Sequence, residues 1–358
     1  MANTAFKEFL KEAERNKEYI KRIKDLLEEG QFGLLPLQQI FTIREGVTKE
    51  TEFGYYSPVS NVTHKDEGCG KETKKLETQV RTGWFDPVPL KVIVSDCYST
   101  LEKTFDAWVA KTGADRFNID DSDYVAFLVS LIENGILNDF NRFVFFADKE
   151  HSVVGSGSGT QVLKAGLNKA NFNVFNGLFS QFEKMVATAI EKKIAIAENA
   201  KTSYADQRAL ADSRAYEVLC QLKDIAGFKA GASPVFVITQ SLATNLTRFM
   251  RKEFRNEQSF KMVEGGYMVS EFEGVPVVTS EWLDDMIRSN FDDGTKWHNP
   301  HRALLLDKNE CQIAIDSMGA LKDIGVEYLG GKFEEVYLKA SYRADFQRVI
   351  GNTGAMAI

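Results

Sequence analysis

The clearest hydrophobic pattern in the chain lies between Asp120 and Phe146. Apolar residues recur there at steps of three and four, the period of one helix face, at Val125, Leu128, Val129, Ile132, Ile136, Phe140 and Phe143. Asp120, Asp121 and Ser122 precede the stripe and can cap a helix N-terminus. The pattern predicts one helix over residues 121–144, about 36 Å long at 1.5 Å per residue, which serves as a spine rather than as a catalytic element.

The opposite side of this spine helix is polar. It carries Ser130, Asn134, Asn138 and Asn141, so we expect it to face solvent or a polar partner. Gly135 lies in the middle of the helix, where glycine costs about 1 kcal/mol relative to alanine. The glycine indicates either a close approach by another backbone or a tolerated weakness.

The first third of the chain divides into two patterns. Residues 4–28 predict an amphipathic helix, either packed on the body or reaching a neighbour as an arm. From Leu37 to Val94 the pattern changes to short strand-like pieces at 39–44, 76–81 and 91–94. About 55 residues with so few apolar side chains cannot easily form a core of their own. We therefore predict a long β-hairpin that projects from the body towards a partner surface, with Val59–Thr73 at its tip.

The middle of the chain is mainly helical. Helices are predicted over 96–111, 177–190 and 205–225, the last ending at Gly227. The GSGSGT segment at 155–160 resembles a phosphate-binding loop, but it lacks the lysine that such a loop requires. A mobile linker explains this segment better.

From Pro234 onward, strands and helices alternate as in an α/β lobe. Strands are predicted at 234–239, 274–278, 300–306 and 312–316, and helices at 240–254 and 281–287. Alternating apolar and charged residues over 333–346 predict a further, half-buried strand.

Composition narrows the function classes. The 358 residues are 44% apolar and 27% charged, ordinary values for one or two globular lobes. The net charge of −7 disfavours tight binding of naked nucleic acid, because neutralising phosphates needs clustered Lys and Arg. A shell that surrounds DNA without gripping it tolerates this charge. The sequence contains neither a membrane-span-length apolar run nor a signal peptide, so synthesis in the cytosol is expected.

Candidate chemistry is sparse. The cysteines are Cys69, Cys97, Cys220 and Cys311; none forms a CxxC pair, so idle thiols are favoured over a zinc site. His298 and His301 lie in one predicted loop without a Cys or HExxH partner, which disfavours a metal site. No GxSxG elbow supports an esterase. The basic segment 248–255 could contact phosphate, but the acidity of its lobe argues against this. No catalytic, cofactor-binding or metal-binding residue is predicted.

The order of these elements resembles the major capsid proteins of tailed phages with the Hong Kong 97-type fold, especially their Bacteroidetes-phage members. The segments GVPVV at 274–278, NPHRALLLDKNECQIAID at 299–316 and FEEVYLKASYRADFQ at 333–347 are similar to that family's turn-strand, strand-turn-strand and closing strand. The resemblance covers nearly the whole chain, and it rests on the order of the elements.

The resemblance implies an α+β fold with five parts. They are an N-terminal arm at 1–36, an extension loop at 37–94, a peripheral domain at 95–170 that contains the spine helix, an axial domain at 171–330, and a C-terminal strand at 331–358 that returns to the peripheral domain. Some family members cross-link a Lys to an Asn. Lys71, Lys74, Lys75 and Asn352 are residues of these two types, and no such bond is predicted for this chain.

The resemblance also implies a function. Copies of the chain would assemble as hexamers and pentamers into an icosahedral shell around double-stranded DNA, without enzymatic activity or a cofactor and without a membrane. Portal, decoration or scaffolding proteins would be partners, and subunits made in the host bacterial cytoplasm would end in the virion capsid. Two alternatives remain: an encapsulin-type compartment, and a soluble α/β enzyme built on the Pro234–Asp316 lobe.

Overall fold

The computed structural model describes residues 37–56, 80–112, 121–153, 162–228, 231–255, 260–263, 266–316, 322–329, 335–349 and 353–358. The predicted helix at 4–28, the loop tip at Val59–Thr73, Cys69 and the GSGSGT segment at 155–160 all lie outside these residues.

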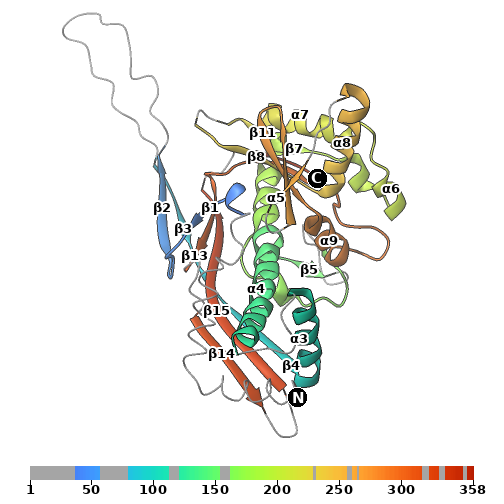
Figure 1. The fold of residues 1–358 in the computed structure, drawn as a ribbon. Coiled ribbons are helices and arrows are strands. Elements are labelled where there is room, and N and C mark those ends of the chain that lie inside the picture. The colour runs from blue at the N-terminus through green and yellow to red at the C-terminus, as the bar shows by residue number, and fades with distance from the viewer. Residues whose placement is uncertain are drawn as a thin grey trace, which may run out of the picture.

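Two sheets and a long helix organise the described chain (Figure 1). The five-stranded sheet contains β1 (Thr42–Arg44), β13 (Cys311–Ile315), β15 (Glu335–Arg348), β14 (Lys322–Leu329) and β4 (Val88–Cys97). The seven-stranded sheet contains, in order, β7 (Lys193–Ile194), β16 (Ala355–Ala357), β12 (Ala303–Asp307), β8 (Pro234–Ile238), β11 (Val275–Ser280), β10 (Tyr267–Phe272) and β9 (Lys261–Met262). The α+β class is confirmed.

The spine helix is confirmed as α4 (Asp121–Phe146), two residues longer than predicted. Its stripe residues Leu128, Ile136, Phe140 and Phe143 are buried in the main core. The polar side behaves as expected where it is described. Asn138 is exposed, and buried Asn141 accepts a hydrogen bond from the Tyr267 hydroxyl at 3.2 Å. A Cβ atom at Gly135 would meet nothing within 4 Å, so this glycine is a tolerated weakness rather than a backbone contact.

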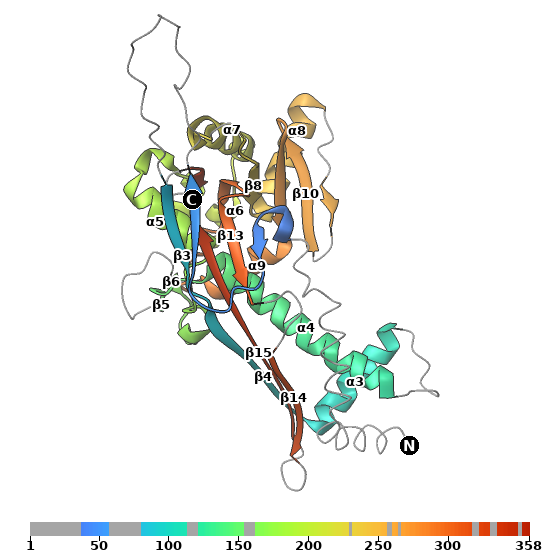
Figure 2. The same ribbon diagram turned by 90° about the vertical axis from the view of Figure 1, so that its left-hand side faces the viewer.

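Strand β15 is the axis of the five-stranded sheet. One side pairs with β4 over ten residues, from Glu335 opposite Cys97 to Ala344 opposite Val88. The other side pairs first with β14 and then with β13. The predicted strand at 333–346 is therefore confirmed, whereas β14 was not predicted. Helix α3 (Tyr98–Thr112) follows β4 and packs Phe105 against Tyr124 and Phe127 of α4. We call β4, β14, the β15 residues paired with them, and α3 the arm (Figure 2). This arm is distinct from the N-terminal arm expected at 1–36.

The predicted hairpin begins later and ends earlier than the range 37–94, at Thr51 and Phe85. Strands β2 (Thr51–Tyr56) and β3 (Val80–Phe85) form an antiparallel pair. Of the other predicted pieces, the one at 39–44 contributes β1, which pairs with β13, and the one at 91–94 lies within β4. Phe53 of β2 and Phe85 of β3 hold this hairpin against the body by packing against Val47 and Ala314.

The α/β lobe is a three-layer structure around the seven-stranded sheet. Helices α7 (Arg214–Ala226) and α8 (Gln240–Phe254) cover one face through Leu219, Leu222 and Leu242. Helix α5 (Leu178–Thr188), helix α9 (Glu281–Asn290) and the end of α4 pack on the other face. The predicted helix at 240–254 is confirmed residue for residue.

Two expectations about this lobe are wrong. The helix predicted over 205–225 is broken into α6 (Tyr204–Arg208) and α7, because tertiary partners take the backbone groups between them. The Glu198 carboxylate accepts the Ala211 N–H at 3.3 Å, and Asn245 bonds both Ala211 and Ala215. The two strands around the 307–310 turn also separate: β12 joins the lobe and β13 joins the five-stranded sheet.

One glycine that the sequence did not flag fixes how α4 meets α5. A Cβ atom on Gly177 would lie 2.6 Å from the Phe143 carbonyl oxygen and 2.8 Å from that of Val144. The Gly177 N–H donates to the Ala147 carbonyl at 2.7 Å. Only glycine allows this approach, so the spine helix and α5 share one closely packed corner.

Candidate functional site

The hairpin is the first surface that the described chain does not cover by itself. Strands β2 and β3 form a sheet of two strands, with no third described strand beside them. Phe53 and Phe85 face the body and are buried, while Trp84 leaves 52% of its surface exposed. A two-stranded hairpin alone is marginally stable in water. Its outward aromatic side chain therefore favours a partner surface.

Strand β4 of the arm is the second such surface. It pairs with β15 along one edge, and no other described strand lies along its second edge. Ile93 and Val94 on this strand are 54% and 42% exposed. A long edge strand with exposed apolar side chains is a template for pairing with another chain. Natural monomers usually protect such edges, so β4 also favours self-association.

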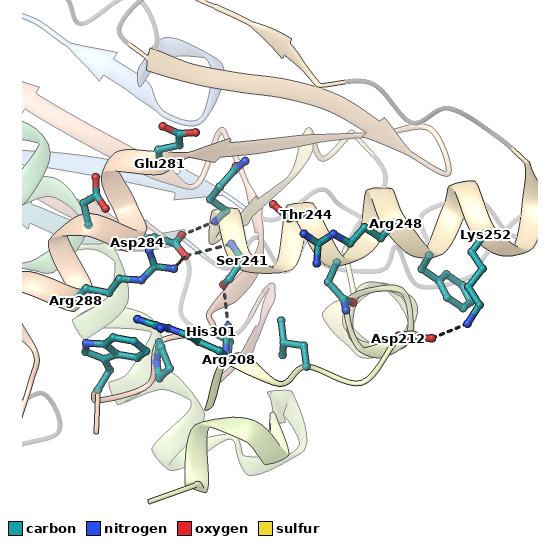
Figure 3. A pocket seen from close by; sticks show the side chains of 17 residues that line it. Arg208, Asp212, Ser241, Thr244, Arg248, Lys252, Glu281, Asp284, Arg288 and His301 are labelled. Carbon is teal, nitrogen blue, oxygen red and sulfur yellow. Dashed lines mark hydrogen bonds and ion pairs between the residues drawn. The ribbon is translucent and has the colours of Figure 1, made fainter. Parts of the chain in front are cut away.

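A polar cavity of about 520 Å³ in the lobe is the third candidate. It lies between α8, helix α9 and the connection between α6 and α7 (Figure 3). Its charged lining residues are Arg208, Asp212, Arg248, Lys252, Glu281, Asp284, Asp285 and Arg288. Equal numbers of basic and acidic groups leave the lining without a strong net charge.

Asp284 caps a helix at one side of this cavity. Its carboxylate accepts the Gln240 N–H at 2.5 Å and the Ser241 N–H at 3.2 Å, the first two amides of α8. Arg288 lies 3.4 Å from the same carboxylate. Burial nevertheless raises the pKa of Asp284 to about 6. The paired carboxylates Asp284 and Asp285 in the sequence predict a solvated helix face, and this prediction is wrong for Asp284, because its side chain is buried.

Ser241 and His301 form a hydrogen-bonded pair beside this cap. The Ser241 Oγ and His301 Nδ1 atoms are 2.8 Å apart, and His301 Nε2 lies 2.7 Å from the Gln207 carbonyl oxygen. Because a carbonyl only accepts, Nε2 carries the proton and Nδ1 accepts from the serine. Burial lowers the pKa of His301. Sequence analysis missed the pair because its members are 60 residues apart.

This pair is poorly arranged for acyl transfer. A serine nucleophile needs a base oriented by a third group and backbone N–H groups aimed at the developing oxyanion. Here a backbone carbonyl takes the place of the orienting carboxylate. The two nearest helix N–H groups are already bonded to Asp284. The Ser241–His301 pair therefore holds the start of α8 against the loop at 299–301.

The other singled-out residues lie apart from this cavity or play no part in it. His298 is half-buried, its buried Nδ1 atom is unbonded, and desolvation lowers its pKa to about 4. Cys97 is exposed, Cys220 is half-buried and Cys311 is buried, each as a free thiol. Within the described ranges, no group of three or more His, Cys, Asp or Glu side chains could hold a metal ion. No helix found there is long and apolar enough to span a membrane.

Comparison with known proteins gives distant likenesses. No protein-family model matches the sequence, and no curated protein matches it. The procapsid of satellite phage P4 that includes the size determination protein is 11% identical, with 90% of this chain and 97% of that chain covered and a TM-score of 0.47. The capsid of a native GTA particle is 13% identical, with 91% and 89% covered and a TM-score of 0.44.

An encapsulin is similar to the same degree. The holo-SrpI encapsulin complex from Synechococcus elongatus is 8% identical, with 90% of this chain and 86% of that chain covered and a TM-score of 0.44. At these values the likeness does not assign the chain to a family.

Proposed function

We propose that this chain is a capsid shell protein whose function is repeated self-association. In the full form of the proposal, hexamers and pentamers build an icosahedral shell around the double-stranded DNA of a tailed bacteriophage. Subunits would be made in the host cytoplasm and would meet portal, decoration or scaffolding proteins during assembly. The chain would act without a catalytic site.

One observation carries the proposal: a well-packed lobe is joined to two projections, each of which leaves a face or an edge that the described chain does not cover. The β2–β3 hairpin and the β4 edge expose Trp84, Ile93 and Val94. A monomeric enzyme gains nothing from such surfaces, and each is an aggregation hazard when uncovered. In a closed shell, a neighbouring copy would cover every projection, so the exposed apolar surfaces would form the interfaces between subunits.

Purified protein separates the candidates. We expect negative-stain microscopy and sedimentation to show closed particles of tens of nanometres. A monomer or dimer at micromolar concentration, under conditions that keep the chain folded, would contradict the proposal. Nuclease-resistant DNA inside particles made in infected cells would support the phage capsid. A co-purified enzyme in place of DNA would support an encapsulin-type compartment instead.

The soluble enzyme is the weakest candidate, and the cavity provides its test. An esterase that used Ser241 would lose its activity in a Ser241→Ala variant. We expect no hydrolysis of nitrophenyl esters above the buffer rate, because the backbone N–H groups near Ser241 are occupied by Asp284. Ester hydrolysis that disappears with Ser241→Ala would overturn this expectation.

A further inference from the structure

The C-terminal half of α8 carries a concentrated set of positive charges. Arg248, Arg251 and Lys252 stand at positions i, i+3 and i+4, and Arg255 follows at i+7 as the C-cap. These spacings place the helical members on one face. All four residues are exposed, in a chain whose net charge is −7. We call these four residues the basic stripe.

Local structure accounts for only part of the stripe. Lys252 pairs with Asp212 at 2.6 Å, and both side chains are more than half exposed, which makes such a pair weak. No carboxylate in the described chain forms an ion pair with Arg248, Arg251 or Arg255. Cations suit the C-terminal end of a helix, but like charges three and four residues apart repel each other. An external anion would relieve that repulsion.

Arg255 provides a second, independent observation. Its backbone has φ +50° in the left-handed region, at the C-cap of α8. Glycine or asparagine is favoured where a helix ends in this conformation. A long cationic side chain is present at a strained position, and strained positions cluster at functional sites.

Exposed apolar side chains lie near the stripe. Phe254 is 55% exposed and Met262, on the neighbouring strand β9, is 78% exposed. Arg248 also lines the cavity, together with Arg208 across it (Figure 3). Cationic side chains interleaved with exposed rings are typical of surfaces that bind the backbone and bases of nucleic acids.

We infer that the basic stripe binds the phosphate backbone of a nucleic acid. The inference rests on the proposed shell function, in which the stripe would touch the enclosed genome. An acidic segment of a second copy fits less well. The densest acidic run in this chain, Asp120–Asp123, offers three carboxylates, whereas a nucleic acid presents a regularly repeating charge. Because about three to four phosphates are engaged, binding is weak at physiological salt.

Salt-dependent binding by unassembled, full-length subunits tests this inference. Fluorescence anisotropy with a labelled 30-base-pair duplex is measured from 25 to 200 mM salt. The slope of log K against log salt changes by about 0.9 for each phosphate contact. A variant with Arg248→Ala, Arg251→Ala and Arg255→Ala should lose about 2.7 from the magnitude of this slope and at least tenfold in affinity at 50 mM salt.

A matched variant removes the same charge elsewhere. Lys103, Lys111 and Lys149 are exposed, and changing all three to Ala should alter affinity less than twofold. An unchanged slope in the stripe variant, or an equal loss in the matched variant, would overturn the inference. Polyglutamate bound as tightly as the duplex would also overturn it and would favour an acidic protein partner.

A single substitution separates the structural role of Arg255 from its binding role. Arg255→Gly relieves the left-handed backbone, so it should raise the melting temperature while it weakens duplex binding severalfold. Weaker binding together with a lower melting temperature would indicate unfolding rather than a lost contact, and would count against the inference. Because the assay uses unassembled subunits, a failure to form shells would contradict the proposed function without touching this result.

Discussion

The lobe and the arm use the same kinds of residues to different ends. In the lobe, helices cover both faces of the seven-stranded sheet, and strands β8 and β12 are almost completely buried. In the arm, β4 alternates between half-buried and exposed residues, and its second edge pairs with no other described strand. The lobe therefore contains the partners that most of its own apolar residues need. The arm is built to receive partners from outside, so stability should depend on the lobe and assembly on the arm.

A core substitution should produce the largest effect on the folded subunit. Phe140 is 2% exposed where the spine helix passes Tyr342 of β15. Phe140→Ala should lower the free energy of unfolding by about 3–5 kcal/mol, because it leaves a cavity that the core cannot fill. Urea denaturation of the unassembled subunit measures this loss. Equal stability of variant and wild type would show that this face of α4 is not part of the core.

Acid should destabilise the lobe through His298. Its pKa is about 4 in the folded protein and 6.5 in the unfolded chain. The unfolded chain therefore takes up the proton first, and stability falls as the pH is lowered from 6.5 to 4. At about 1.4 kcal/mol per pKa unit, the loss approaches about 3 kcal/mol. A His298→Gln variant should lose less stability over this range, and parallel unfolding profiles would exclude His298 as the cause.

Asp284 should act in the opposite direction over an overlapping range. Its folded pKa of about 6 lies above the ordinary 3.8, so the folded form binds a proton more readily. Its contribution therefore favours the folded state below pH 4 and is lost as the pH rises through 6. Asp284→Asn should lose stability on acidification more steeply than the wild type. A shallower acid profile than that of the wild type would contradict this sign.

A smaller effect, and a gain, is expected at Gly135. A Cβ atom there meets open space, so Gly135→Ala should raise the free energy of unfolding by about 1 kcal/mol. Gly177→Ala is the contrasting control, because its Cβ would meet two carbonyl oxygens of α4 and should destabilise the subunit. A loss of stability in both variants would show that Gly135 has a contact of its own.

A substitution on the exposed surface of β4 should have the smallest effect on folding and a large effect on assembly. Ile93→Asp changes an exposed side chain of β4, so the unfolding free energy should stay within about 0.5 kcal/mol of the wild type. Shell formation should nevertheless fail, because the charge prevents another chain from covering this surface. Sedimentation measures the assembled fraction, and Lys103→Ala on α3 serves as the surface control. Normal shells from Ile93→Asp would remove β4 from the list of interfaces.

In both regions the sequence predicted single elements better than the partners that those elements take. Helices α4 and α8 and strand β15 were predicted closely, because each carries a periodic apolar pattern that is local to the segment. The broken helix at 209–213 could not be predicted, because Glu198 and Asn245 supply its hydrogen bonds from other elements. Sheet membership of β12 and β13 depends on pairing partners far away in the chain. The Ser241–His301 contact likewise exists only once the lobe has folded.

The turn between β12 and β13 has a mechanical consequence. Glu310 accepts a hydrogen bond from the Val349 N–H at 2.8 Å, and its carboxylate accepts another from the Thr353 hydroxyl. The chain passes from the lobe to the five-stranded sheet between β12 and β13, and it returns to the lobe between β15 and β16. Glu310 therefore links these two connections to each other. Because these two hydrogen bonds tie both chain crossings to one residue, we expect the junction to be stiff and not to act as a hinge. In a shell, subunits at different positions would have to bend by different amounts. That bending would have to occur in the far half of the arm, where β15 is flanked only by β4 and β14 among the described strands.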